Sequence, residues 1–270
     1  MREWEAYIPE EERKIYEKAG YKGKDQFGRN PALLIIDVIT GFTGTRAMPV
    51  MEAIDEFPTS CGQVAWDALP KIQQLLGACR DAEVPVIYST SDPDFKAAFG
   101  NATKRGVDAT DFEKLATQFP EMIKPREGEF IVRKARASAF FGTHLITYLV
   151  RKNIDCLLVT GTSTCGCVRG TVLDGYSFGY PVFLVEECVF DRSRTSHLVN
   201  LFEMNAKYAT VIQLSEALNY VQQLNDSKVE KRSEPSISDQ VSEQKRDACL
   251  SSFPLELHSA SAIRIFIAHQ

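Results

Sequence analysis

Three kinds of side chain that could do chemistry together stand at the ends of apolar runs in this sequence. Asp37 ends one such run, Lys134 ends a second, and a third leads into two cysteines, Cys165 and Cys167. A carboxylate can accept a proton, an ammonium group can stabilise negative charge, and a thiol can act as a nucleophile. Together these residue types could supply the proton acceptor, the cation and the nucleophile of one catalytic site.

The turn that carries the two cysteines is built of small residues. Residues 161–171 read GTSTCGCVRGT and lead directly into a predicted helix over residues 166–179. A cysteine in the first turn of a helix lies near the positive end of the helix dipole and near N–H groups without intrahelical partners. We therefore expect this position to lower the thiol pKa and to hold a thiolate nucleophile. The same N–H groups could form an oxyanion hole for a tetrahedral intermediate.

Other interpretations of this turn have less support, and one stays open. No Gly-Lys-Ser or Gly-Lys-Thr follows, as a phosphate-binding Walker loop requires, and the Gly-x-Gly-x-x-Gly spacing of dinucleotide-binding folds is absent. Cys165 and Cys167 lack the Cys-x-x-Cys redox spacing, and no second pair of Cys or His stands nearby to complete a zinc site. A structural turn with two buried thiols remains the alternative to a catalytic one.

Six apolar runs must position these residues. They are mostly continuous rather than alternating, which is typical of strands covered on both faces in a parallel sheet. Their alternation with helical stretches predicts an α/β fold, doubly wound, with a mostly parallel six-stranded sheet and helices on both faces. Ligands of such sheets collect at the carboxyl ends of the strands. The predicted strands span residues 31–38, 85–90, 130–134, 156–160, 181–185 and 209–212, and the predicted helices span 64–83, 143–152, 166–179 and 193–206.

The composition divides the chain into three parts. Residues 1–27 form an N-terminal helix and arm, in which segment 8–20 has proline and glutamates first, lysine near its end and glycine last, as in a capped helix. Residues 28–224 form the α/β domain, and residues 91–125 interrupt its alternation as an expected loop or lid. Residues 225–270 form a polar tail that we expect to be disordered or weakly helical.

Composition and charge exclude several classes of protein. Of the 270 residues, 44% are hydrophobic and 25% are charged, which argues against a disordered or fibrous chain. The net charge of −5 disfavours nucleic acid and anionic membranes as partners, and no apolar run approaches the roughly 18 to 20 residues of a membrane span. The charged N-terminus and the seven scattered cysteines favour a reduced, cytoplasmic setting. We expect Cys79, Cys156 and Cys188 to be small buried hydrophobes.

Longer motifs around these residues resemble one family. Asp37, Lys134 and the turn 164–168 together resemble the isochorismatase-like cysteine hydrolases, and the resemblance covers roughly residues 28–220. Further motifs look most like the N-carbamoylsarcosine amidase branch of that family. They read DGY at 174–176, GYPV at 179–182 and ECVFDR at 187–192.

The resemblance assigns roles to the residues of the site. It implies that Asp37, Lys134 and Cys167 form a catalytic triad, with the backbone N–H groups of Thr164 and Cys167 as the oxyanion hole. The family's cis peptide bond would lie between Ser163 and Thr164. Asp37 would take the thiol proton, Lys134 would support the charges, and the thiolate would attack an amide or carbamoyl carbon.

The resemblance also bears on ligands and partners. It implies that Ser163 and Arg192 contact the substrate, with the Arg192 guanidinium gripping a carboxylate. A surface arginine paired with Asp191 is the alternative. No cofactor and no metal are expected, because the metal-binding histidines of the nicotinamidase branch have no counterpart after residues 88–92. A homo-oligomer, a dimer or a tetramer, is the expected assembly.

The expected activity is therefore cysteine-dependent hydrolysis of a small linear amide or carbamoyl compound, with a thioester intermediate and release of ammonia. If Arg192 binds a carboxylate, the resemblance implies an amide acid such as N-carbamoylsarcosine or maleamate. If it does not, a neutral urea derivative such as biuret becomes attractive. Two other classes remain, an ether-cleaving isochorismatase and a catalytically silent, oligomeric binding protein.

Overall fold

The part of the chain that can be described covers most of the predicted arm and α/β domain. The computed structural model describes residues 1–21, 23–92, 94, 100, 103–104 and 113–233. By its internal contacts the chain forms two units, Met1–Asp226 and Ser227–Gln270, and the fold below is that of the first. The predicted tail lies outside the described residues from residue 234 onward. The predicted limits of the arm, domain and tail stay predictions.

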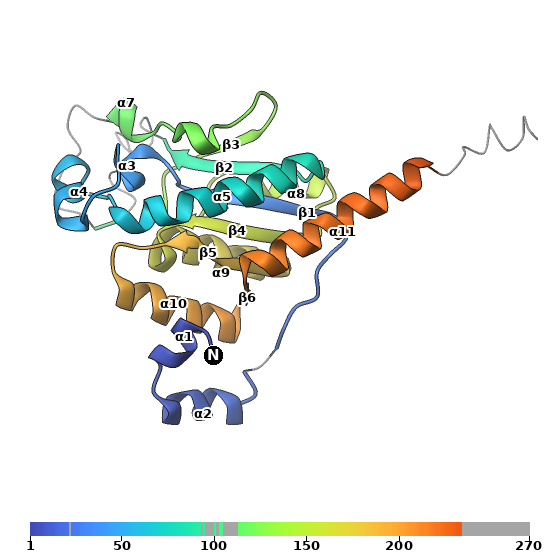
Figure 1. The fold of residues 1–270 in the computed structure, drawn as a ribbon, viewed down its shortest axis with the longest axis horizontal. Helices are drawn as coiled ribbons and strands as arrows, with labels where there is room; N and C mark the ends of the chain where they lie inside the picture. Colours follow the sequence, from blue (N-terminus) through green and yellow to red (C-terminus); the bar gives the residue numbers. More distant parts are fainter. Residues whose placement is uncertain (22, 93, 95–99, 101–102, 105–112, 234–270) are drawn as a thin grey trace, which may run out of the picture. The chain divides into compact units, whose positions relative to one another are not determined.

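Six strands form one fully parallel sheet (Figure 1). Their order is β3-β2-β1-β4-β5-β6. Strands β2 and β3 therefore lie on one side of β1, and β4, β5 and β6 lie on the other. This confirms the predicted α/β fold with a doubly wound sheet. The strands are β1 (Pro31–Ile36), β2 (Val86–Ser91), β3 (Phe130–Lys134), β4 (Cys156–Thr162), β5 (Val182–Phe190) and β6 (Thr210–Ile212).

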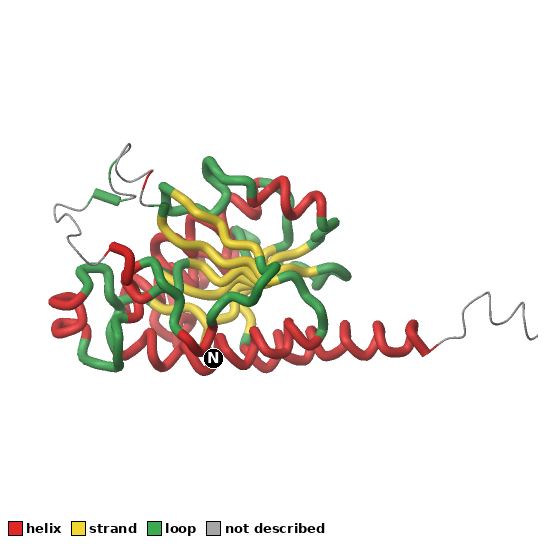
Figure 2. Tube along the Cα trace, turned by 90° about the horizontal axis from the view of Figure 1, so that it is seen from above, coloured by secondary structure: helices red, strands yellow, loops and turns green. Residues whose placement is uncertain are grey.

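Helices cover both faces of the sheet, which explains why the central strand β1 is apolar throughout. All six residues of β1 are buried, and alternate side chains join different cores. Figure 2 shows the strands lying between helices. Leu33 and Ile35 pack with α5 (Gln63–Asp81) and α11 (Leu214–Ser233), whereas Leu34 and Ile36 pack with α8 (Leu145–Arg151), α9 (Arg169–Ser177) and α10 (Arg194–Lys207).

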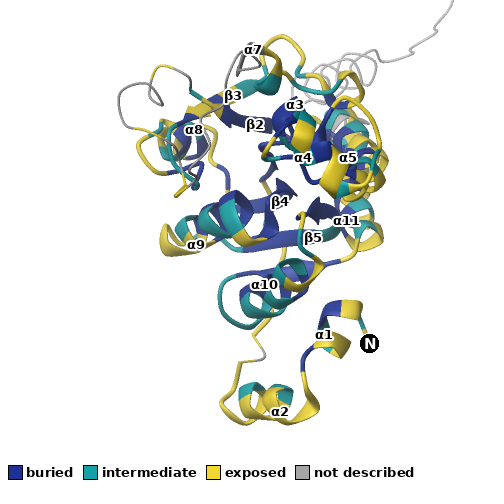
Figure 3. Cartoon of the chain, turned by 90° about the vertical axis from the view of Figure 1, so that its left-hand side faces the viewer, coloured by how far each residue is buried: buried dark blue, intermediate teal, exposed yellow. Residues whose placement is uncertain are grey.

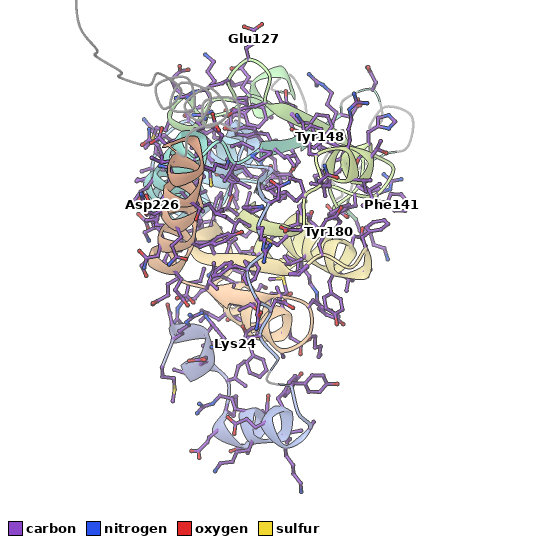
Figure 4. The ribbon with its side chains drawn as sticks, turned by 90° about the vertical axis from the view of Figure 1, so that its right-hand side faces the viewer. Lys24, Glu127, Phe141, Tyr148, Tyr180 and Asp226 are labelled. Carbon is purple, nitrogen blue, oxygen red and sulfur yellow. The ribbon has the colours of Figure 1, made fainter. Side chains whose placement is uncertain are left out.

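The N-terminal arm contains two helices where the sequence predicts one. The predicted helix is α2 (Glu10–Lys18), and a shorter helix, α1 (Glu3–Tyr7), precedes it. Helix α1 packs against α10, and its Trp4 is buried, with the indole N–H donating to Glu186 at 2.7 Å. In Figure 4, Lys24 marks the segment that leads from α2 to the sheet.

Short elements fill the loops at the carboxyl ends of the strands. Helices α3 (Thr40–Thr43) and α4 (Val50–Glu56) lie between β1 and α5. The expected lid over residues 91–125 lies partly outside the described residues, and its described part contains α7 (Glu113–Ala116) and the 3₁₀ turn η1 (Glu121–Ile123).

Two further sequence expectations concern cysteines and membranes. Cys79, Cys156 and Cys188 have no exposed surface and pack in the core, as predicted. Among the helices of the described residues, none combines the length and the apolar character needed to cross a membrane.

Candidate active site

The sheet reverses its order between β1 and β4, and the candidate site lies where these two strands end. In open parallel sheets this reversal opens a crevice at the carboxyl edge. Asp37 directly follows β1, the turn with the cysteines follows β4, and Lys134 is the last residue of β3. Figure 3 views the sheet from this edge. The three predicted residues therefore reach one place from three different strands.

Close contact between β1 and β4 requires a glycine at position 161. Gly161 has a positive φ of 104°, and a Cβ there would stand 2.1 Å from the carbonyl oxygen of Ile36. Asp37 also has a positive φ, 49°, in the left-handed region that Asp and Asn tolerate better than most residues. Both strands thus end in unusual backbone conformations beside the site.

Lys134 joins the carboxylate to the thiol. Its Nζ lies 2.7 Å from Asp37 Oδ2 and donates to Cys167 Sγ at 3.4 Å. A third contact, from Nζ to the carbonyl oxygen of Arg136 at 3.1 Å, completes the hydrogen bonding of the ammonium group. Asp37, Lys134 and Cys167 are 3%, 5% and 8% exposed, so water screens these interactions weakly.

Burial and the neighbouring charges set the protonation of this cluster. Burial favours the uncharged form of Lys134, but Asp37 and Cys167 outweigh it, so the pKa of Lys134 is raised and the side chain is an ammonium ion. Burial, followed by the negative charge of Asp37, raises the pKa of the Cys167 thiol to about 12, although Lys134 opposes this. The expectation of a lowered thiol pKa is therefore wrong. Burying a thiolate beside a carboxylate costs more than the positive end of a helix dipole offsets.

Helical structure around the Cys167 thiol begins at Thr164, two residues before the predicted start at residue 166, and its first turn is more widely wound. A π-helical turn, η2 (Thr164–Val168), precedes α9, and the carbonyl oxygen of Ser163 accepts from the N–H groups of Gly166 at 2.8 Å and Val168 at 3.2 Å. The cis peptide bond joins Thr162 to Ser163, one bond before the position that the resemblance implied.

Two side chains from the segment after β5 hold this turn from outside. Asp191 Oδ2 accepts the backbone N–H of Cys165 at 2.9 Å, and His197 Nδ1 lies 2.8 Å from Thr164 Oγ1. Burial lowers the pKa of His197, which favours the neutral ring. The sequence motif at 187–192 contained Asp191 only as a possible partner of Arg192. Its contact with the cysteine turn had no signal in the sequence.

One further residue contacts Asp37 that the sequence did not single out. Ser89 lies in the middle of β2 and is 1% exposed. Its hydroxyl donates to Asp37 Oδ1 at 2.6 Å and accepts the Asp37 backbone N–H at 3.1 Å. A small hydroxyl residue inside an apolar strand looks like any other buried serine until its partner is known.

The two predicted substrate-binding residues lie in different environments. Ser163 is buried and forms the start of the cysteine turn. Arg192 is exposed, and its Nη2 donates to the carbonyl oxygen of Thr59 at 2.8 Å. Arg192 also lines a cavity of about 350 Å³ with Asp191 and His197, and this cavity does not include Asp37, Lys134 or Cys167 among its lining residues.

Within the described ranges, no three His, Cys, Asp or Glu side chains converge as ligands for a metal ion. The chemistry open to the cluster is that of a thiol, a carboxylate and an ammonium group. A carboxylate beside a thiol can take its proton as a nucleophile attacks, and a nearby ammonium group can stabilise the charges.

Comparison with known proteins identifies the family. The isochorismatase domain matches residues 31–216, which include every residue of the cluster, and the chain belongs to the isochorismatase family. It is 33% identical over 203 residues to maleamate amidohydrolase of Pseudomonas putida, covering 73% of this chain and 90% of that protein. It is 29% identical over 220 residues to N-carbamoylsarcosine amidase of an Arthrobacter species, covering 78% of each chain.

Solved structures show the same fold. An isochorismatase family protein from Desulfovibrio vulgaris is 27% identical, with a TM-score of 0.57, and the match covers 73% of this chain and 100% of that one. N-carbamoylsarcosine amidase from Thermoplasma acidophilum is 22% identical, with a TM-score of 0.52, and the match covers 68% of this chain and 96% of that one.

Proposed function

We propose that the chain is a cysteine-dependent amidohydrolase that cleaves the C–N bond of a small linear amide or carbamoyl compound and releases ammonia. The observation that carries this proposal is the buried cluster in which Lys134 Nζ contacts both Asp37, at 2.7 Å, and the Cys167 sulfur, at 3.4 Å. The amidohydrolases and amidases among the relatives support the reaction class.

The raised thiol pKa gives Asp37 a defined task in the first half of the reaction. Because the Cys167 thiol is protonated at neutral pH, its proton passes to the Asp37 carboxylate as the sulfur attacks the carbonyl carbon. The carbonyl oxygen becomes an oxyanion that the N–H groups of Thr164 and Cys167 can bind. The intermediate then collapses, the C–N bond breaks, and protonated Asp37 returns the proton to the departing nitrogen as ammonia.

The second half of the reaction hydrolyses the thioester. Asp37, again a carboxylate, takes a proton from water as the water oxygen attacks the thioester carbon. The C–S bond breaks, the acid product leaves, and the proton on Asp37 returns to the Cys167 sulfur. Lys134 remains an ammonium ion throughout, and it stabilises whichever of the Asp37 carboxylate and the Cys167 sulfur carries the negative charge at each step.

The preferred substrate is a short amide acid. Maleamate and N-carbamoylsarcosine are the substrates named for the two relatives with the greatest similarity described above, and both carry a carboxylate. Arg192 is exposed and makes one hydrogen bond to a backbone carbonyl in the structure, so its guanidinium could turn to receive that carboxylate. Biuret is the alternative if Arg192 does not take part.

The remaining expectations concern assembly and location. We propose a homo-oligomer, a dimer or a tetramer, in the cytoplasm. The six cysteines among the described residues are all free thiols, which supports a reducing compartment.

Ammonia release from N-carbamoylsarcosine, maleamate and biuret tests the proposal. We expect turnover of at least one of these compounds by the wild type and no detectable turnover by Cys167→Ala. Cys165→Ser is the matched control, because Cys165 is an exposed cysteine in the same turn, whereas the Lys134 ammonium group donates to Cys167. Undiminished activity of Cys167→Ala would refute the assignment, and no ammonia from any compound would favour an ether hydrolase or a binding protein.

A further inference from the structure

Ser89 and Asp37 form a closed pair of hydrogen bonds. The Ser89 hydroxyl donates to Asp37 Oδ1 at 2.6 Å, and the Asp37 backbone N–H donates back to the same hydroxyl at 3.1 Å. The first bond lies at the short end of the range of O–H···O hydrogen bonds, which is about 2.5 to 3.0 Å. Because the N–H occupies one side of the hydroxyl oxygen, the hydroxyl hydrogen is directed at the carboxylate.

The topology explains why this contact can be rigid. Strand β2 lies between β1, which Asp37 follows, and β3, which ends in Lys134. Ser89 pairs in register with Val132 of β3, two residues before Lys134. Ser89 is therefore fixed by ladder hydrogen bonds on the strand between the carboxylate and its cation. Strands hold a side chain more precisely than loops do.

The contacts divide the carboxylate between two fixed donors. Ser89 holds Oδ1, and Lys134 holds Oδ2 at 2.7 Å. Among the residues that the structure describes, the charged or titratable groups that face Asp37 are Lys134, from β3, and Cys167, from η2. Ser89, from β2, is the uncharged donor of the set. With both oxygens held, the carboxylate plane is fixed relative to the thiol.

We propose that Ser89 is a positioning residue that keeps Asp37 ionised and oriented to receive the Cys167 proton. This rests on the proposed function, because it gives Asp37 the role of proton acceptor. Loss of the hydroxyl removes a donor to the ionised carboxylate and frees the carboxylate to rotate. Asp37 then takes up its proton at higher pH, and the thiol proton has a poorer acceptor.

The pH profile of kcat/KM for the preferred amide tests the role. For Ser89→Ala we expect kcat to fall about 10- to 100-fold with little change in KM, and the acidic limb to move up by about one to two pH units. Ser89→Thr keeps the hydroxyl and is expected to restore most of the rate. Thr90→Val is the matched control, because Thr90 is a buried neighbour on β2 whose hydroxyl donates to the carbonyl oxygen of Thr117 instead.

A measurement without substrate separates this proposal from the proposed function. The carboxyl carbon of Asp37 is followed by NMR against pH in the wild type and in Ser89→Ala, with the signal assigned by its loss in Asp37→Asn. A higher titration midpoint in Ser89→Ala supports the positioning role even if no amide is hydrolysed. An unmoved midpoint in folded Ser89→Ala overturns it. If Ser89→Ala does not fold, Ser89→Cys, a weaker donor of similar shape, replaces it with the same two outcomes.

Discussion

Replacing Lys134 by methionine tests the electrostatic account of the site. Lys134→Met keeps much of the side-chain volume and removes the ammonium group from Asp37, to which it is joined at 2.7 Å with both side chains 4% exposed. The carboxylate is then buried without its cation. We expect the variant to lose hydrolytic activity and to be markedly less stable than the wild type at neutral pH.

The magnitude follows from burial. Removing one partner of a buried ion pair costs about 3 to 5 kcal/mol, because the other charge is left uncompensated. For a folded unit of this size, that corresponds to a fall in Tm of roughly 6 to 20 °C. The retained hydrogen bond from the Ser89 hydroxyl to Asp37 Oδ1 favours the lower end of this range.

The pH dependence has a definite sign. Against the lowering effect of burial, the pKa of Lys134 is raised in the folded state, chiefly by Asp37. Its contribution to stability is therefore fully present below the unfolded pKa of a lysine, about 10.4, and is lost as pH rises through the folded pKa. The difference in stability between wild type and Lys134→Met should be similar at about pH 5 and about pH 8 and should shrink above about pH 10.

Urea unfolding followed by circular dichroism measures these differences, with two matched variants. Lys14→Met makes the same change in an exposed pair with Glu10, where both side chains are more than two-thirds exposed, and should change stability by at most about 0.5 kcal/mol. Asp37→Asn/Lys134→Met removes both charges and should regain most of the lost stability, since Asn tolerates the left-handed backbone at position 37. A single variant as stable as the wild type at every pH would refute the reasoning.

Two further predictions concern Gly161, near the end of β4, and the thiol of Cys167 in the turn that follows. Gly161→Ala should prevent folding or lower the unfolding midpoint severely, because its methyl group would stand 2.1 Å from the Ile36 carbonyl oxygen at a φ of +104°; a soluble variant with wild-type thermal stability would contradict this. Alkylation of Cys167 by iodoacetamide, measured by mass spectrometry, should be slow at pH 7 and still rise at about pH 10, because the pKa of the thiol is raised to about 12. A rate that levels off near neutral pH would show a preformed thiolate, and Cys165, an exposed thiol whose pKa is raised to about 11, provides the internal comparison.

The fold was predictable because parallel strands and their covering helices leave a strong pattern. All six predicted strands are present, with β3 at its predicted limits, because continuous apolar runs reflect burial on both faces. Strand β5 continues to Phe190, five residues past its predicted end at Val185. The end was predicted too early because two glutamates follow Val185, and charged residues are typical of the end of a buried strand. Helix α1 was missed because five residues carry too little periodicity.

The site was predictable at the level of residue types and strand ends. The structure brings Asp37, Lys134 and Cys167 into contact, and their catalytic roles stay a prediction. The thiol pKa was predicted wrongly, because a sequence shows the helix position of Cys167 but not the depth of its burial or the carboxylate beside it. Ser89 and His197 were missed as contacts of the site, because each acts through a partner far away in the sequence.

The central pairing of the sheet also has a consequence for the order of events during folding. Strand β1 pairs with β4, so that Pro31 meets Cys156 and Ile36 meets Gly161, across a long stretch of chain. Such distant pairings form slowly, since a large loop must close before they are made. During synthesis on the ribosome, the edge of β1 that pairs with β4 therefore stays unpaired until β4 has been synthesised. The same pairing brings Asp37 next to the cysteine turn, so the cluster of Asp37, Lys134 and Cys167 can form only after β4 has joined β1.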